Sequence, residues 1–144
     1  MNKRTNAMRA NLALTIASAV VLVSLAAPAS GHHSFAAEFD ARQPVKFTAT
    51  VRRMRWTNPH VWIYVDVTRP DGTVEDWAIE AGTPNVLFRR GFSKESLAPG
   101  TEIIVDGYRA KDGSRRANGR DLTFADGQTL FLGSPGTGAP VEQP

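Results

Sequence analysis

The chain has 144 residues and a formal net charge of +3, with 17 basic residues, 14 acidic residues and no cysteine. This length suits one small domain, and the lack of cysteine excludes disulfides, thiolate metal sites and thiol nucleophiles. Three of the basic residues and none of the acidic residues lie in residues 1–31, so the remainder is electrically neutral. A neutral domain lacks the basic excess that binding to phosphates requires, and we therefore expect no nucleic acid among its partners.

Residues 1–31 have the layout of a Sec signal peptide: basic residues first, then an uncharged apolar run, then small residues. The apolar run is shorter than the roughly 20 residues that a membrane-spanning helix needs, so we expect no transmembrane anchor once the signal is removed. Cleavage after Ala29 and cleavage after Gly31 both satisfy the preference for small residues at the cut. The sequence therefore predicts a soluble protein exported to the periplasm.

Three further segments are predicted after the signal. Residues 32–46 show only a short apolar patch among charges and are expected to form an N-terminal arm that lies on the domain. Residues 47–133 consist of short β-type runs separated by turn residues, and they are expected to form the domain itself. Residues 134–144 are rich in glycine and proline and are expected to be a disordered tail.

The clearest strand is predicted from His60 to Thr68, because its valine and isoleucine residues alternate with polar and aromatic ones. A turn at Pro70–Gly72 leads into a second strand over residues 73–80. A three-residue loop sets the register of this hairpin so that apolar residues face one another in three pairs: Val61 with Ala81, Ile63 with Ile79, and Val65 with Trp77.

The remaining elements complete an all-β pattern with small α content. A strand over residues 47–56 needs a bulge at Arg52 and Arg53 to keep its alternation, and a short helix is predicted between Thr83 and Gly91. Strands at 101–108, 116–124 and 129–132 follow. The order β-β-β-α-β-β, with one short helix between strands three and four, predicts an OB-like small β-barrel, and an open β-sandwich or roll is the main alternative.

Three segments carry a family resemblance: HHSFAAEFD at residues 32–40, WTNPH at 56–60, and LAPG at 97–100 before a strand that ends in Gly107. Together they resemble the domain of unknown function 6152 family of small exported bacterial proteins. The resemblance covers essentially the whole chain after the signal. It implies an envelope protein and supplies no mechanism.

The three histidines of the chain are the residues that most specifically indicate a chemical function. His32 and His33 lie at the expected mature N-terminus, and His60 begins the central strand. A free α-amine with a neighbouring imidazole, completed by His60 or His33, suits Cu(II) or another divalent metal. In that interpretation Glu80 or Asp66 accepts a hydrogen bond from the His60 ring. The alternative is that His32 and His33 form an exposed tail that binds no metal, and that His60 is a strand-entry residue bonded to its loop.

A second hypothesis uses the other side of the central hairpin, where Trp62, Tyr64, Asp76 and Glu80 point away from the valine core. Exposed aromatic rings there would form a ligand-binding face that stacks on a glycan or contacts an envelope protein, without metal. The alternative is that Phe35 and Phe39 of the arm cover these rings.

No nucleophile motif, phosphate loop or dinucleotide fingerprint occurs in the sequence, and no zinc-hydrolase spacing is present. We therefore expect a binding protein and not an enzyme. An oxidative copper enzyme built on an N-terminal histidine is a third and weaker hypothesis.

Overall fold

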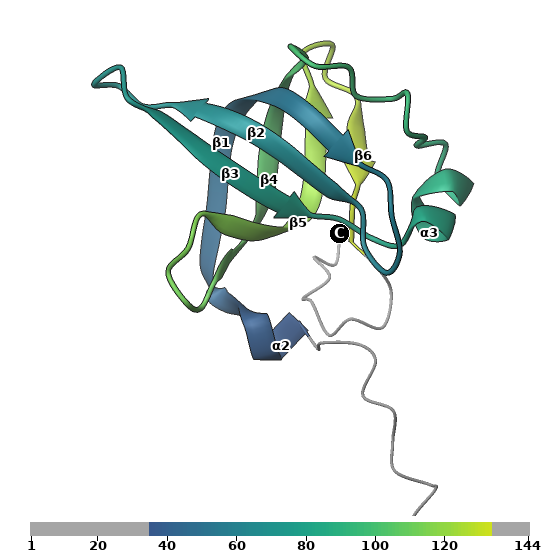
Figure 1. Cartoon of the computed structure of the whole chain (residues 1–144), viewed down its shortest axis with the longest axis horizontal. Helices are drawn as coiled ribbons and strands as arrows, with labels where there is room; N and C mark the ends of the chain where they lie inside the picture. Colours follow the sequence, from purple (N-terminus) through teal and green to yellow (C-terminus); the bar gives the residue numbers. More distant parts are fainter. Residues whose placement is uncertain (1–34, 134–144) are drawn as a thin grey trace, which may run out of the picture. The chain divides into compact units, whose positions relative to one another are not determined.

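The computed structural model describes residues 35–133, which form a mostly β domain with two short helices (Figure 1). In chain order the elements are α2 (Phe35–Glu38), β1 (Phe39–Arg55), β2 (Trp62–Thr68), β3 (Val74–Glu80), α3 (Pro84–Arg89), β4 (Glu102–Ala110), β5 (Arg116–Phe124) and β6 (Thr129–Phe131). The predicted fold class, β-rich with one short helix between the third and fourth strands, is confirmed. The two terminal segments predicted as signal peptide and tail lie outside the described residues.

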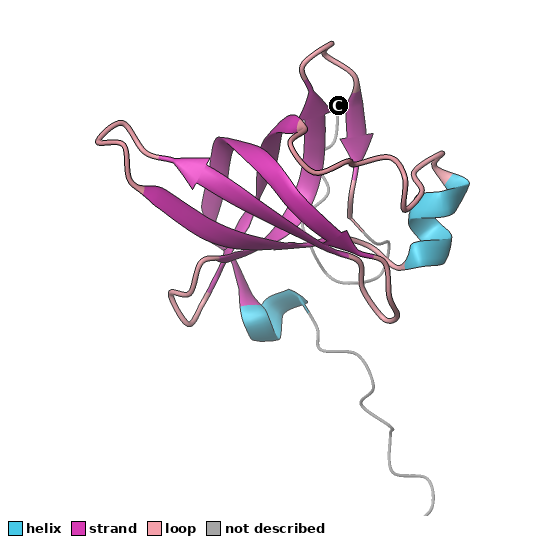
Figure 2. Cartoon of the chain, turned by 45° about the horizontal axis from the view of Figure 1, so that its top comes forward, coloured by secondary structure: helices cyan, strands magenta, loops and turns pink. Residues whose placement is uncertain are grey.

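The strands form one sheet in the order β3-β2-β1-β4-β5-β6, and not the two packed sheets of a sandwich. All of these neighbours are antiparallel, and a short parallel pairing of β3 with β5 joins the two sides of the sheet. The result is a barrel-like ring that is only partly closed. Figure 2 shows both helices at the periphery of the strands.

The predicted hairpin register is confirmed. Ile63 pairs with Ile79 and Val65 with Trp77 in the β2–β3 ladder, while the Ala81 amide donates to the Val61 carbonyl oxygen at 2.8 Å. The β1–β2 ladder shifts register between Val51 and Arg53, which is the predicted bulge. Because of this register, one face of the hairpin carries apolar side chains inward and the other faces away from the core.

The core lies inside the ring and consists largely of branched aliphatic side chains from every long strand. The largest fully buried side chains are Phe92, Ile63, Ile79, Leu87, Ile103, Leu122, Leu132, Val51, Val61, Val65 and Val105. Leu87 is brought in by α3, whose N-cap is Thr83 and whose first residue is Pro84. Fixed proline geometry and a hydroxyl that accepts from the Val86 amide at 3.3 Å explain why this six-residue helix begins there.

The predicted arm over residues 32–46 is wrong for its described part, because β1 already begins at Phe39. Phe39 pairs with Ala110 and Pro44 with Tyr108, and the β1–β4 register shifts between these two pairs. This irregularity interrupts the alternation of apolar residues, which is why the sequence pattern showed no strand here. The first strand therefore continues as a paired part of the sheet toward the N-terminus.

Within residues 35–133 no helix is long and apolar enough to cross a bilayer. The two helices described here have four and six residues.

Candidate functional site

His60 stands just before β2, at the loop that follows β1, and its side chain is 17% exposed. Its Nδ1 atom lies 3.2 Å from the carbonyl oxygen of Ala81 and 3.4 Å from Oε1 of Glu80. A carbonyl oxygen only accepts hydrogen bonds, so Nδ1 is the donor. In the neutral ring, Nε2 then carries the lone pair that binds a metal or accepts a proton.

Glu80 lies on the outer face of the sheet, yet it is only 9% exposed. It pairs across the sheet with Trp62 of β2 on one side and with Asn118 of β5 on the other. Asn118 in turn pairs with Tyr108 of β4. Four outer-face residues therefore follow one another across four strands at one level of the ring, and we call this series the outer row: Trp62, Glu80, Asn118 and Tyr108.

Burial of Glu80 and Asn118 was not predicted from the sequence. Alternation places Glu80 on the outer side of β3, as expected, but it says nothing about what lies over that side. Asn118 is 7% exposed and lies between Ala117 and Gly119 on β5. The alternation of apolar and polar residues in this strand does not predict that a polar side chain is buried there. The predicted fold class could have indicated this burial, because closing the ring of an OB-like fold brings strand five beside strand three.

The N-terminal end of the described chain is fixed on Tyr108. Phe35 and Phe39 stack at a centroid distance of 5.9 Å, and the Phe35 ring meets the Tyr108 ring edge-on at 5.4 Å. With Ala110 these residues form a small buried cluster separate from the main core. The hypothesis that Phe35 and Phe39 cover Trp62 and Tyr64 is therefore wrong, because the two rings pack against β4.

The aromatic face on β2 is partly occupied by the protein itself. The guanidinium of Arg53 lies 3.7 Å from the centre of the Tyr64 ring, which is a close cation–π contact. Trp62 and Tyr64 are both half-buried. Of the two predicted stacking platforms, Tyr64 has one ring face covered by Arg53. Among residues 35–133, no arginine or lysine stacks on Trp62 in this way.

Asp76 and Asp66 directly oppose each other on β3 and β2, and Arg52 forms ion pairs with both. Arg52 is the extra residue of the β1 bulge, and its Nε atom lies 3.1 Å from Oδ1 of Asp66. Asp66 is thus engaged with Arg52, while Glu80 is the carboxylate near His60. Of the two acceptors predicted for the His60 ring, the structure selects Glu80.

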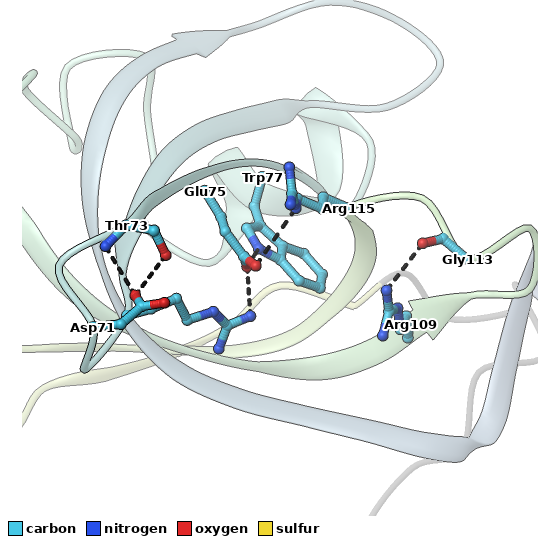
Figure 3. A network of polar contacts seen from close by, with 8 residues as sticks. Asp71, Thr73, Glu75, Trp77, Arg109, Gly113 and Arg115 are labelled. Atoms are coloured by element: carbon cyan, nitrogen blue, oxygen red, sulfur yellow. Dashed lines mark hydrogen bonds and ion pairs between the residues drawn. The ribbon is translucent and has the colours of Figure 1, made fainter.

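A second polar cluster lies at the opposite end of β3, around Glu75 (Figure 3). Glu75 accepts hydrogen bonds from Arg69 and from the indole nitrogen of Trp77, the latter at 2.9 Å, and Arg115 lies 3.6 Å away. The hydrogen bonds from Arg69 and Trp77 lower the pKa of Glu75 below its ordinary value of 4.5. Glu75 lies five residues before Glu80 on β3, about 16 Å along the strand, so this cluster does not belong to the His60 site. It links β3 to the turn that contains Arg69 and to the loop that contains Arg115.

Residues 35–133 contain no group of three His, Cys, Asp or Glu side chains that could hold a metal ion. His60 and Glu80 are brought together, whereas His32 and His33 lie outside the described residues. A metal site that uses His60 therefore needs ligands from outside this part of the chain.

Residues 19–119 match the family of unknown function DUF6152. The chain belongs to this family. The part of the chain that matches DUF6152 includes all three histidines. It also includes Glu80 and Asn118, the two buried polar residues of the outer row, and Tyr108, against which Phe35 packs. No curated protein matches the chain.

Proposed function

We propose that this protein is exported to the periplasm and there binds a divalent metal ion, copper first, through His60 together with His32 and His33. The observation that carries the proposal is the orientation of the His60 ring. Its Nδ1 atom is engaged by Ala81 and Glu80, which leaves the Nε2 lone pair for a metal. Metal-binding histidines are held in this way in most metal sites, by an oxygen acceptor on the nitrogen that does not bind the ion.

Chain geometry supports the contribution of His32 and His33. Phe35 is fixed on Tyr108, and His33 and His32 precede it by two and three residues. Each residue spans at most about 3.6 Å, so two and three residues of chain span at most about 7 and 11 Å. Tyr108 and Glu80 are two strand spacings apart in the outer row, about 10 Å. A segment of this length before Phe35 is therefore long enough for an imidazole side chain to come to the level of His60 and Glu80.

The ligand types favour copper among the divalent ions. Imidazole nitrogens and an N-terminal amine suit Cu(II), and the chain has no cysteine to favour a thiolate-bound metal. The two cleavage sites proposed for the signal, after Ala29 or Gly31, both leave His32 within three residues of the free amine. The proposal therefore holds for either mature N-terminus.

The test is a competition titration of Cu(II) against a chelator, with untagged protein that has been processed by its own cell. The wild type is expected to take up one equivalent. His32→Ala and His60→Ala are each expected to lower the affinity at least tenfold, since each removes one nitrogen ligand. The matched control is Asn85→Ala, which changes an exposed side chain on α3.

An affinity that is the same in the wild type and in both histidine variants would overturn the proposal. In that case the metal-free alternative, a glycan or envelope protein bound on the outer face of β2 and β3, becomes the working hypothesis. Trp62→Ala should then abolish the interaction with little change in the thermal midpoint, because Trp62 is half-buried and not among the core residues.

A further inference from the structure

Arg109 on β4 has a guanidinium group that contacts no carboxylate of the described residues. Its side chain is half-buried, and its Nε atom is buried without a hydrogen-bond acceptor among residues 35–133. Within this part of the chain its Nη2 atom donates to the carbonyl oxygen of Gly113, at 2.9 Å. A guanidinium has five N–H donors and a permanent charge, so most of this capacity is unused. Arginine side chains that are withdrawn from water are normally paired with an anion.

The carboxylate of the cluster around Trp77 is engaged by two other arginines. Glu75 accepts hydrogen bonds from Arg69 and from the Trp77 indole. The Nε atom of Arg115 lies 3.6 Å from the other carboxylate oxygen of Glu75. The Cζ atom of Arg109 lies 5.8 Å from the centre of the Trp77 ring, and Figure 3 shows Glu75 on the other side of the indole. Glu75 therefore compensates the charge of its own two arginines and leaves that of Arg109.

This cluster lies at the end of the ring opposite α3. Glu75 stands at the start of β3, whereas α3 follows the end of that strand (Figure 1). Arg69 and Arg115 are 39% and 57% exposed, so solvent reaches this end of the ring. The half-buried Phe47 packs on Trp77 at a centroid distance of 4.9 Å and provides apolar surface beside the charges. Ligand sites are often located at the mouths of β-barrels, where apolar walls surround a few polar groups.

We propose that this end of the ring binds an oxyanion, the carboxylate or phosphate group of a small ligand, and that Arg109 is its principal contact. The Nη1 group of Arg109 donates to the oxyanion, and the exposed guanidinium of Arg115 adds a second positive charge at the rim. Hydrogen bonds between ionised groups are the strong ones, and partial burial of Arg109 reduces their screening by water. The site lies at the other end of β3 from Glu80 and His60, so it does not depend on the proposed metal.

The test is a titration of the metal-free, processed wild-type protein with sodium acetate and, separately, with sodium phosphate. Proton–nitrogen NMR follows the Nε–H signals of the arginine side chains. Sodium chloride at matched ionic strength is the reference, because any salt screens exposed arginines. We expect a saturable shift of the Arg109 signal with acetate, phosphate or both, and no saturable shift with chloride. The anion that binds more tightly identifies the preferred group of the ligand.

Two variants show whether Arg109 is the contact. Arg109→Met keeps the length of the side chain and removes its charge, so the affinity for the preferred anion, followed at the Gly113 backbone amide, should fall at least tenfold. Arg89→Met removes an exposed arginine on α3 and should bind like the wild type. A wild type without a saturable shift for either anion, or an Arg109→Met variant with unchanged affinity, would overturn the proposal. If Arg109→Met does not fold, Arg109→Lys is judged by the same two results, because lysine lacks the planar set of donors.

Discussion

The Nδ1 atom of His60 lies 3.2 Å from the carbonyl oxygen of Ala81, the first residue after β3. This contact joins the loop before β2 to the end of its partner strand, and it determines which ring nitrogen carries hydrogen. In the neutral ring His60 should be the Nδ1-protonated tautomer. Long-range proton–nitrogen NMR of the metal-free protein measures this directly. A ring protonated on Nε2 would remove the basis for metal binding at that atom.

Phe35 should control copper affinity without touching the metal, because it fixes the end of the segment that contains His32 and His33. Phe35→Ala removes the edge-on contact with Tyr108 and should destabilise the small cluster on β4 by about 3 kcal/mol. We expect at least a tenfold loss of copper affinity, measured by competition titration. Phe35→Leu keeps apolar burial and serves as the control. Equal affinities in the alanine and leucine variants and the wild type would show that Phe35 does not position the ligands.

Arg52 should stabilise the domain by separating two opposed carboxylates. Asp66 and Asp76 face each other across β2 and β3, and like charges in that position are destabilising. Because all three side chains are partly exposed, Arg52→Ala should lower the free energy of unfolding by only about 1 kcal/mol in a denaturant titration.

Two further variants test the cause of that loss. Adding Asp76→Asn to Arg52→Ala removes the opposed charge and should recover part of the stability. Arg55→Ala, an exposed arginine on the same strand, should change the stability by less than about 0.5 kcal/mol. A double variant no more stable than Arg52→Ala alone would show that the carboxylate pair is not the cause.

Glu75 should make the stability of the domain depend on pH in acid. Its pKa in the folded protein is lowered, chiefly by the hydrogen bond from Arg69 and then by that from Trp77. A lowered folded pKa stabilises the protein above the ordinary value of 4.5, and this contribution is lost as the pH falls through the folded value. Glu75→Gln should therefore be less stable near neutral pH, and the difference should shrink between about pH 5 and 3. Urea titrations over this range measure it; a constant difference would contradict the assignment.

Local patterns were sufficient to predict the hairpin. The alternation of valines in β2, the turn before Val74 and the pairing of Ile63 with Ile79 all follow from side-chain period and loop length, and the structure confirms them. The start of β1 could not be predicted in the same way. An irregular stretch between Phe39 and Pro44 breaks the period, and its pairing with β4 joins residues about 70 positions apart.

The candidate site was predictable in residue type but not in arrangement. His60 and Glu80 were expected on one face, and they are in contact. The burial of Glu80 and the placement of Asn118 beside it depend on the parallel pairing of β3 with β5, which forms only when the ring closes. Asp76 was expected on a ligand-binding face, but the bulge in β1 directs Arg52 onto it. Contacts between distant strands, and not local periodicity, decide which outer-face residues are buried or engaged in ion pairs.

Native mass spectrometry of the untagged wild type and of His60→Ala, each purified from the periplasm of its own cells, tests the proposed function most directly. One spectrum reports both the mature N-terminus and any retained metal. Under the proposed function, we expect a wild-type mass that begins at Ser30 or His32 and includes one copper ion, and a His60→Ala mass without copper. A wild-type protein that is metal-free and takes up no copper at one equivalent against a competing chelator would contradict it.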